Sequence, residues 1–340
     1  MNIQPTEFSA VALYEEGRKI SQDKHKEAEE KAKRTLRVGS SGCLLPDGSV
    51  LGTSPWKALA RFLGYQIPIT DKSFDIFDGG YTNESMWDRY LRERGTEFTG
   101  ESNYPLRYEI EGVPVTGRPD LVILNKITKE PVFGIELKGI MSLKTAQDVL
   151  YGDKPKDDNF IQAAHYCHKF NLPWILCYTS NSVFEGNYWT KKNYGVESVP
   201  PFSKEFKIGC EDGKFYYITE SGIKVPTLVT VEGIEDYYRA ILESAKQRDI
   251  SWMQMSEGDI HGVRRNYDLN LYDDLCLLVS PNTSFDNWVG GVETAFKQTR
   301  YIKTKKVAKE QVYRVYDGDL LLDEFKTVEE AREFIFGGEG

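Results

Sequence analysis

The sequence predicts an α/β protein with a mixed central sheet. Three observations predict it: a helix with one apolar face, a run of three strand-like segments, and a second helix that leads into an apolar strand. In chain order these segments are residues 79–95, then 104–111, 113–124 and 131–138, and then 158–170 and 173–180. The order is therefore helix, three strands, helix, strand, which a single sheet covered by helices accommodates.

Length and composition are those of an ordinary globular protein. The chain has 340 residues, of which 40% are hydrophobic, so it can bury a core of normal size as one elaborated domain or two. No apolar run approaches the roughly 18 residues that a membrane span requires, and the start MNIQPTEFSA lacks the basic-then-apolar layout of a signal peptide. We therefore expect no membrane partner and a cytoplasmic protein, in the host cytoplasm if a virus encodes it.

The cysteines and the net charge narrow the possible kinds of metal site and of binding partner. None of the 5 cysteines forms a CxxC pair or a Cys/His run with metal-ligand spacing, so reduced thiols with mostly structural roles are expected. The net charge of -9 disfavours non-specific binding of polyanions through the whole surface, but it allows a local basic groove.

Two helices are expected before the first of these segments. Residues 14–36 mix Glu and Lys at spacings of three and four, as in a solvated helix stabilised by side-chain pairs, so residues 1–36 are assigned to an N-terminal helical arm. Ser54 and Pro55 then precede WKALARFLG, which ends in Gly64. A cap residue, a proline in the first turn and a glycine stop predict a helix here.

The helix over residues 79–95 carries a carboxylate on its apolar face. Glu84, Trp87 and Leu91 stand at positions i, i+3 and i+7, so Glu84 is expected to point toward the core. The strand-like segments after this helix are separated by Gly112 and by NKITKE, which predicts a short antiparallel meander.

The rest of the chain is expected to extend this core. Residues 37–200 are assigned to the core, and residues 201–300 to an α+β extension, because EFKIG and KFYYITE have strand character and a helical pattern follows. Residues 301–340 are predicted to form a small hairpin-plus-helix module, with an Asp-Gly turn in YRVYDGDLLL and a capping box in TVEE. The lysines of KTKKVAK are interpreted as a solvated linker or as a strip that follows a nucleic-acid backbone.

Three charged residues stand out on the last two strands of the meander. Asp120 lies in VTGRPDLVIL and is expected to share a face with Arg118 and Val122, because side chains alternate along a strand. Glu136 and Lys138 likewise share a face in GIELKG, with apolar residues pointing the other way. Burying unpaired charges costs several kcal/mol, roughly, so these groups need a compensating partner.

A divalent cation is such a partner. Asp120, Glu136 and a main-chain carbonyl such as that of Leu137 offer hard oxygen ligands, which suit one or two Mg²⁺ or Mn²⁺ ions and disfavour zinc. A bound ion of this kind lowers the pKa of a water and neutralises charge on a phosphate, and Lys138 would orient that water. The alternative is that the acids and the lysine merely pair with one another at a solvent-facing edge.

These residues resemble a known signature. The tripeptide RPD ending at Asp120, followed on the next strand by the tripeptide ELK at residues 136–138, resembles the motif of the PD-(D/E)XK nuclease superfamily. The helix with Gln162 and Tyr166 is similar to the QxxxY motif of its RecB-like branch, which includes phage-encoded and CRISPR-associated exonucleases. The resemblance covers residues 36–180 and implies a restriction-endonuclease-like core.

The resemblance also implies a role for each motif residue. Asp120 and Glu136 would bind the metal, and Lys138 would be the catalytic lysine. Gln162 and Tyr166, one helical turn apart, would complete the catalytic group by positioning the lysine or a substrate phosphate, although they also fit a polar helix face with a half-buried tyrosine.

Other residues near the motifs are interpreted as follows. Glu84 stands where the branch carries an additional metal ligand, or it is a carboxylate favoured by the helix dipole. His165 and His168 flank Tyr166 on a helix expected to be half exposed, and are interpreted as surface or packing residues. Some RecB-like nucleases hold an iron–sulfur cluster through four cysteines, but only Cys43 stands near the expected first position and no late cluster follows, so none is expected here.

Substrate contacts are predicted from basic and hydroxyl side chains near these motifs. The predicted set is Arg37, Ser40, Ser41, Arg118 and Lys144. The alternatives are a structural loop for the first three residues and an ordinary solvated lysine for the last.

The sequence thus favours a metal-dependent DNA nuclease, and the resemblance suggests an exonuclease acting on DNA ends or single strands. Its setting would be phage-type DNA replication, recombination or degradation. Two alternatives remain open: a sequence- or structure-specific endonuclease, and an inactive nuclease fold that serves as a DNA-binding module.

Overall fold

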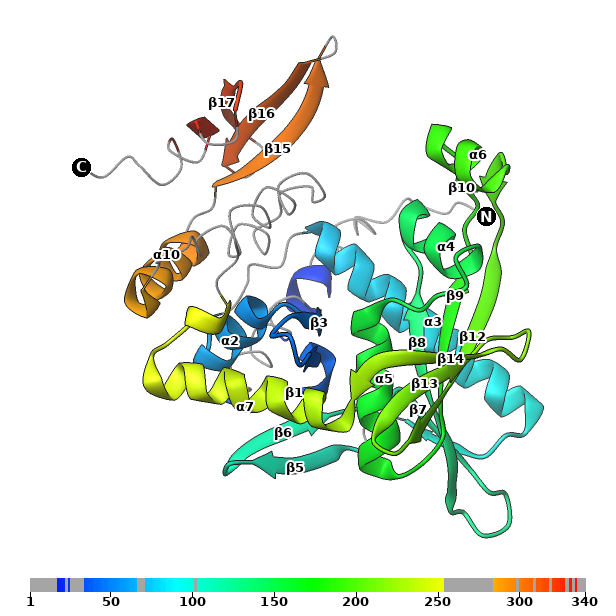
Figure 1. The fold of residues 1–340 in the computed structure, drawn as a ribbon. Helices are drawn as coiled ribbons and strands as arrows, with labels where there is room; N and C mark the ends of the chain where they lie inside the picture. The colour runs from blue at the N-terminus through cyan, green and yellow to red at the C-terminus, as the bar shows by residue number, and fades with distance from the viewer. Residues whose placement is uncertain are drawn as a thin grey trace, which may run out of the picture.

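The computed structural model describes residues 17–21, 24, 34–65, 71–100, 103–253, 284–297, 300–307, 310–317, 320–327, 330–331 and 334. Within these residues the protein is a mixed α/β structure built on a seven-stranded sheet (Figure 1). In spatial order the strands are β14 (Lys224–Thr230), β13 (Lys214–Ile218), β12 (Phe202–Glu211), β9 (Trp174–Ser180), β8 (Pro131–Gly139), β7 (Leu121–Leu124) and β4 (Phe98–Gly100). Strands β8 and β9 are parallel and all other neighbours are antiparallel, so the predicted mixed sheet is confirmed.

Smaller sheets surround this central one. They are formed by β1 (Leu36–Arg37) with β6 (Val113–Gly117) and β5 (Leu106–Ile110), by β2 (Gly42–Leu44) with β3 (Val50–Gly52), by β10 (Phe184–Glu185) with β11 (Ser198–Val199), and by β15 (Arg300–Val307), β16 (Glu310–Asp317) and β17 (Leu320–Phe325). The helical segments are η1 (Val38–Ser40), α2 (Pro55–Leu63), α3 (Asp71–Arg94), α4 (Leu143–Leu150), α5 (Asp157–Phe170), α6 (Tyr188–Tyr194), α7 (Val231–Gln247), η2 (Ser251–Met253) and α10 (Phe285–Lys297).

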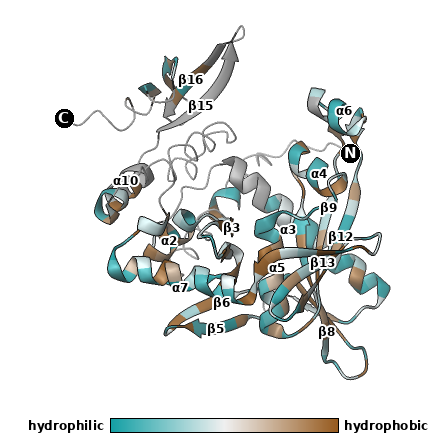
Figure 2. Ribbon diagram, viewed as in Figure 1, coloured by the Kyte–Doolittle hydropathy of each residue, from teal (hydrophilic) through white to brown (hydrophobic). Residues whose placement is uncertain are grey.

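Helices α5 and α3 lie on opposite faces of the central sheet (Figure 1). On the α5 side, Trp174 and Leu176 of β9 enter the main hydrophobic core. On the α3 side, Leu137 of β8 belongs to a smaller core together with Trp87 and Leu91. In Figure 2 the central strands carry much of the hydrophobic colour, whereas the outer end of α3 is largely hydrophilic. This arrangement buries both faces of β8, the strand that carries the ELK tripeptide.

The predicted meander is wrong in its first two segments. Strands β5 and β6 pair with each other and with β1 in a separate sheet, and the unpredicted strand β4 takes the place beside β7. The expected long strand 113–124 is interrupted at Pro119, which has no N–H to donate to a ladder and holds the preceding residue extended. Asp120 therefore lies just before β7, while the exposed Arg118 belongs to the connection between two sheets.

Other elements follow the sequence closely. Helix α2 begins at Pro55 and ends at Gly64, whose φ of 93° is the left-handed conformation expected of a glycine stop. The capping box before the last helical residues is present, because Glu330 N donates to Thr327 Oγ1 and Thr327 N donates to a Glu330 oxygen. Residues 17–21 and 24 are helical, as predicted for the N-terminal arm, and the rest of the arm before residue 34 lies outside the described residues.

Some elements differ from expectation. Helix α3 begins at Asp71 rather than near residue 79, and α4 was not predicted at all. The lysines 303, 305 and 306 lie in β15, a strand paired with β16, and not in a linker. By contrast, the strands after residue 200 extend the core as predicted, because β12 pairs with β9 and continues the central sheet.

The close contact between β8 and β9 provides a test of this fold. Gly134 pairs with Trp174, and a Cβ built on Gly134 would lie 2.3 Å from the indole ring, which is fully buried. We expect Gly134→Ala to lower the free energy of unfolding by roughly 1–3 kcal/mol, because the ring must move within a packed core. Urea denaturation measures this change. Gly290→Ala in α10, where a Cβ meets open space among the described residues, is the control, and equal stability of the two variants would contradict the pairing.

Candidate active site

Asp120 is positioned by the register of β7 and β8. Leu121 pairs with Ile135, which places the half-buried Asp120 beside the next part of β8. Its Oδ2 accepts a hydrogen bond of 2.6 Å from the main-chain N–H of Leu137. The first predicted carboxylate is thus held against the strand that carries the other two groups.

Glu136 and Lys138 lie on the opposite side of β8 from Leu137, as strand alternation predicted. The Glu136 side chain is 1% exposed and accepts a hydrogen bond of 2.6 Å from Lys138 Nζ. The Lys138 side chain is 24% exposed, so the amine end of this pair is the part that solvent reaches. The two residues therefore form a largely buried ion pair that opens outward at the lysine.

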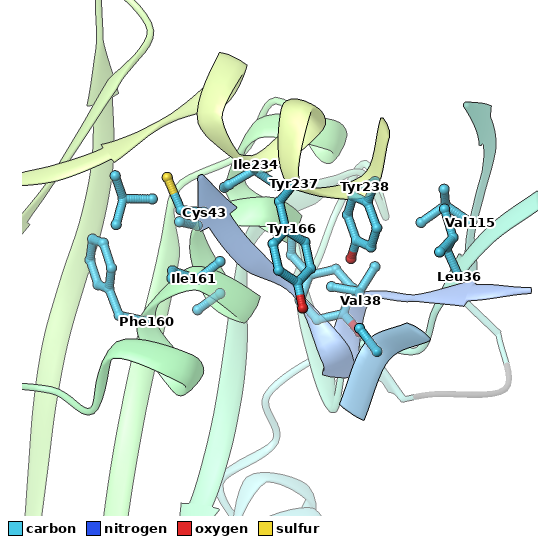
Figure 3. Packing of buried hydrophobic residues seen from close by; sticks show 14 of the residues in the cluster. Leu36, Val38, Cys43, Val115, Phe160, Ile161, Tyr166, Ile234, Tyr237 and Tyr238 are labelled. Carbon is cyan, nitrogen blue, oxygen red and sulfur yellow. The ribbon is translucent and has the colours of Figure 1, made fainter. Parts of the chain in front are cut away.

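Helix α5 supplies further groups around the lysine. Lys138 Nζ donates a second hydrogen bond, of 3.1 Å, to Gln162 Oε1. Tyr166, one turn later and fully buried, lies near Val38 (Figure 3), and both side chains lie beside Gly117. The structure thus brings Gln162 and Tyr166 together with Lys138, as the motif implies.

The electrostatics of this group reflect crowded negative charge. Burial raises the pKa of Asp120 well above its usual value, Glu136 and then Glu84 raise it further, and Lys138 and the Leu137 N–H oppose the rise. Burial alone would lower the pKa of Lys138, but Glu136 and Asp120 more than reverse this and raise the pKa. The lysine therefore stays charged, and one ammonium does not offset all of the neighbouring carboxylates.

Glu84 lies on α3, three residues before Trp87, which packs in the smaller core. It is half-buried on α3 and acts on the pKa of Asp120 through its charge. Among the residues that the structure describes, no three His, Cys, Asp or Glu side chains gather closely enough to hold an ion by themselves. Two carboxylates, Asp120 and Glu136, are therefore the close pair, with Glu84 outside it.

The close pair fits a hard divalent cation. Both side chains present oxygen, the carbonyl of Leu137 belongs to the same stretch of β8, and Mg²⁺ commonly binds through one or two carboxylates plus waters. A positive ion would also offset the cost of burying the Asp120 carboxylate beside Glu136, the two largest causes of its raised pKa. Asp120 and Glu136 are the residues that could hold such an ion.

The predicted substrate residues have different environments. Ser40 is buried and accepts a hydrogen bond of 2.9 Å from Arg61, and Ser41 is buried with hydrogen bonds to Val38 O and to Tyr238. Neither hydroxyl is open to a phosphate, so the structure does not support a substrate contact at Ser40 or Ser41. The other three residues of the set lie nearer to solvent: Arg37 is half-buried, and Arg118 and Lys144 are exposed.

His165 is the centre of a buried polar network, not a half-exposed residue as the sequence suggested. Its Nδ1 lies 3.0 Å from Ser41 Oγ and its Nε2 lies 2.7 Å from Tyr108 Oη. Burial lowers the pKa of His165 to about 3, and the nearby Lys169 lowers it in the same direction. The neutral ring therefore joins α5 to η1 and β5 immediately behind Tyr166, which agrees with a packing role. His168 is exposed.

Two residues near Lys138 were missed by sequence reasoning. Tyr178, fully buried on β9, is the strand neighbour of Lys138, and its hydroxyl accepts hydrogen bonds from Lys156 N at 3.0 Å and from Asn159 Nδ2 at 3.1 Å. These two hydrogen bonds hold the start of α5 against β9. The sequence could have indicated Asn159, because it stands three residues before Gln162 on the same helix face.

The sequence matches no protein-family model and no curated protein. Two solved structures resemble the fold. SSO0001 is 12% identical, with a TM-score of 0.34 over 66% of this chain and 85% of that chain. An alkaline exonuclease, LHK-Exo from Laribacter hongkongensis, is 14% identical, with a TM-score of 0.37 over 65% of this chain and 93% of that chain. Likeness at this level carries no argument about function, which must come from the site itself.

The lengths and hydropathies of the helices can be compared with those of a membrane span. Across the described ranges, every helix is too short or too polar to cross a bilayer.

The buried His165 predicts a pH dependence of stability. The folded-state pKa of His165 is about 3 and the unfolded value is 6.5, so the unfolded chain binds the extra proton between these values. This contribution to stability is complete above pH 6.5 and falls by about 1.4 kcal/mol per pH unit as the pH drops below it. Urea unfolding at several pH values measures the slope.

The control is the exposed His168 on the same helix. His165→Phe should flatten the slope between pH 6 and 5, roughly, while His168→Gln should leave most of it. A wild-type slope that persists in His165→Phe would show that the ring is not buried in its neutral form.

Proposed function

We propose that this chain is a divalent-metal-dependent nuclease that hydrolyses DNA. The observation that carries the proposal is a pair of hydrogen bonds near the end of β8. Asp120 Oδ2 accepts one from Leu137 N, and Glu136 Oε1 accepts the other from Lys138 Nζ, each at 2.6 Å. A buried acid, a half-buried acid and a partly exposed amine in such contact match the needs of phosphodiester hydrolysis.

The chain's own groups have distinct parts in this proposal. Bound Mg²⁺ or Mn²⁺ would supply an activated water and neutralise charge on the phosphate. Lys138 would orient the water and donate to a phosphate oxygen from the solvent side of the pair. Glu136 and Gln162 hold the amine in one position, so little reorganisation is needed when substrate binds.

The alternative to a catalytic site is an ion pair between Glu136 and Lys138 that only stabilises the fold. A structural pair is best served by equal and opposite charge, because unpaired charge in a buried place is costly. Here two carboxylates, Glu136 and Asp120, act on one lysine, and the pKa of Asp120 is raised first by burial and then by the charges of Glu136 and Glu84. The excess of acids favours a site for a cation over a pair that is complete by itself.

The finer proposal is an exonuclease that acts on DNA ends or single strands in phage-type replication, recombination or degradation. Its support is the QxxxY pattern on α5, since Gln162 contacts the lysine and Tyr166 contacts Gln162. Arg118 and Lys144 are proposed as substrate contacts because both side chains are exposed.

Cleavage of labelled linear DNA with Mg²⁺ or Mn²⁺ tests the nuclease proposal. Lys138→Ala and Glu136→Gln should each lower the rate by roughly 10²- to 10³-fold, because each removes a group that acts on the developing charge. Lys126→Ala, in the exposed turn between β7 and β8, should cleave at the wild-type rate. Equal degradation by wild type and Lys138→Ala would end the assignment of this lysine.

Two further measurements separate the alternatives. An exonuclease leaves closed circular DNA intact, whereas an endonuclease opens it. A binding module would bind DNA without turnover, and its metal titration would give the same heat in wild type and in Glu136→Gln. We expect intact circles and a metal-binding heat that depends on Glu136.

A further inference from the structure

Tyr178 of β9 lies directly beside the proposed catalytic lysine. Lys138 pairs with Tyr178 in the parallel ladder of β8 and β9, so the two side chains point to the same face of the sheet. This is the face that α5 covers, since Lys138 reaches Gln162 of that helix. Tyr178 is fully buried, so its hydroxyl does not touch a substrate, and any effect on the reaction passes through another residue.

The hydroxyl of Tyr178 anchors the start of α5 at two points. It accepts hydrogen bonds from the main-chain N–H of Lys156, the N-cap residue, at 3.0 Å and from Asn159 Nδ2 at 3.1 Å. The side chain of Lys156 makes no cap hydrogen bond, so the tyrosine supplies a polar contact that the cap lacks. Two donors three residues apart set both the position of the helix along its axis and its rotation about that axis.

These contacts close a ring with the lysine. Asn159 and Gln162 stand three residues apart and share a side of α5. Gln162 Oε1 accepts a hydrogen bond of 3.1 Å from Lys138 Nζ. The ring therefore crosses the strand pair from Lys138 to Tyr178, enters α5 at Asn159 and returns through the glutamine. Without the hydroxyl, the start of α5 could shift relative to β9, and Gln162 would shift with it.

The ring matters because it sets the direction of the ammonium group. An ammonium has three N–H donors, and in the described part of the chain Lys138 uses two of them, on Glu136 Oε1 at 2.6 Å and on Gln162 Oε1 at 3.1 Å. Two fixed acceptors leave one direction for the third N–H, which is the donor available to a water or a phosphate oxygen in the proposed reaction. Burial raises the pKa of Tyr178, so its hydroxyl is uncharged at neutral pH and affects the lysine through geometry rather than charge.

We infer that Tyr178 is a positioning residue of the proposed nuclease. By holding α5, its hydroxyl keeps Gln162 in the place that directs the third N–H of Lys138 toward the reacting groups. A residue that only sets the direction of such a donor contributes to the chemical step and not to substrate binding. This inference rests on the proposed nuclease function.

The kinetics of Tyr178→Phe on labelled linear DNA with Mg²⁺ test the inference. The variant keeps the ring but loses the hydroxyl, so kcat should fall by about tenfold while KM stays within about twofold of the wild-type value. Tyr237→Phe is the matched control, because Tyr237 of α7 is also fully buried and its hydroxyl donates to Thr53 O at 2.9 Å. The control should keep the wild-type kcat.

A double-mutant cycle asks whether Tyr178 acts through Gln162. Gln162→Ala removes the acceptor that Tyr178 positions, so adding Tyr178→Phe to it should lower kcat by less than about twofold. A hydroxyl that only stabilises the fold would lower kcat by the same factor in both backgrounds. Asn159→Ala removes one of the two donors and covers the case in which Tyr178→Phe does not fold. It should show the same fall in kcat and the same dependence on Gln162.

The outcomes separate the two proposals. If wild type does not cleave DNA, the nuclease function fails and this inference fails with it. If wild type cleaves, and whichever of the two variants folds keeps its kcat, raises KM instead, or lowers kcat equally with and without Gln162, the nuclease function stands and the positioning role is wrong.

Discussion

A carboxylate buried within a sheet is the constraint on which the rest of this structure depends. Glu136 is 1% exposed on a strand packed on both faces, and an ionised group there needs compensation. Lys138 provides part of this compensation through its hydrogen bond to Glu136. The β7–β8 register also brings a second carboxylate, Asp120, to the Leu137 N–H. A slip of one residue between these strands would turn Asp120 to the face opposite Glu136 and Lys138, which stay together on β8.

Helix α5 serves the site and the fold at once. Gln162 reaches Lys138, whereas His165, three residues later, reaches Ser41 and Tyr108. Residues three apart lie on the same side of a helix but almost one turn apart along it, so the two side chains reach different partners. Because the histidine network fixes α5 against η1 and β5, the glutamine and the tyrosine keep one position relative to β8.

Helix α3 is well packed in one part and poorly packed in another. Its second half packs Trp87 and Leu91 against the sheet. Its middle carries Gly80, where a Cβ would meet no described atom within 4 Å, and Asn83, whose buried Oδ1 has no donor among the described residues. Both features lower the stability of this part of the helix.

Sequence alone determined the mixed sheet, the helices at 55–63, 157–170 and 231–247, and the alternation that puts Glu136 and Lys138 on one face, because these depend on local period and end signals. It did not determine that β5 and β6 leave the central sheet, that Ser41 is buried, or that Tyr178 meets the start of α5. Pairing partners and burial depend on residues far apart in the chain, whose meeting no local pattern records. Only the tertiary structure could decide them.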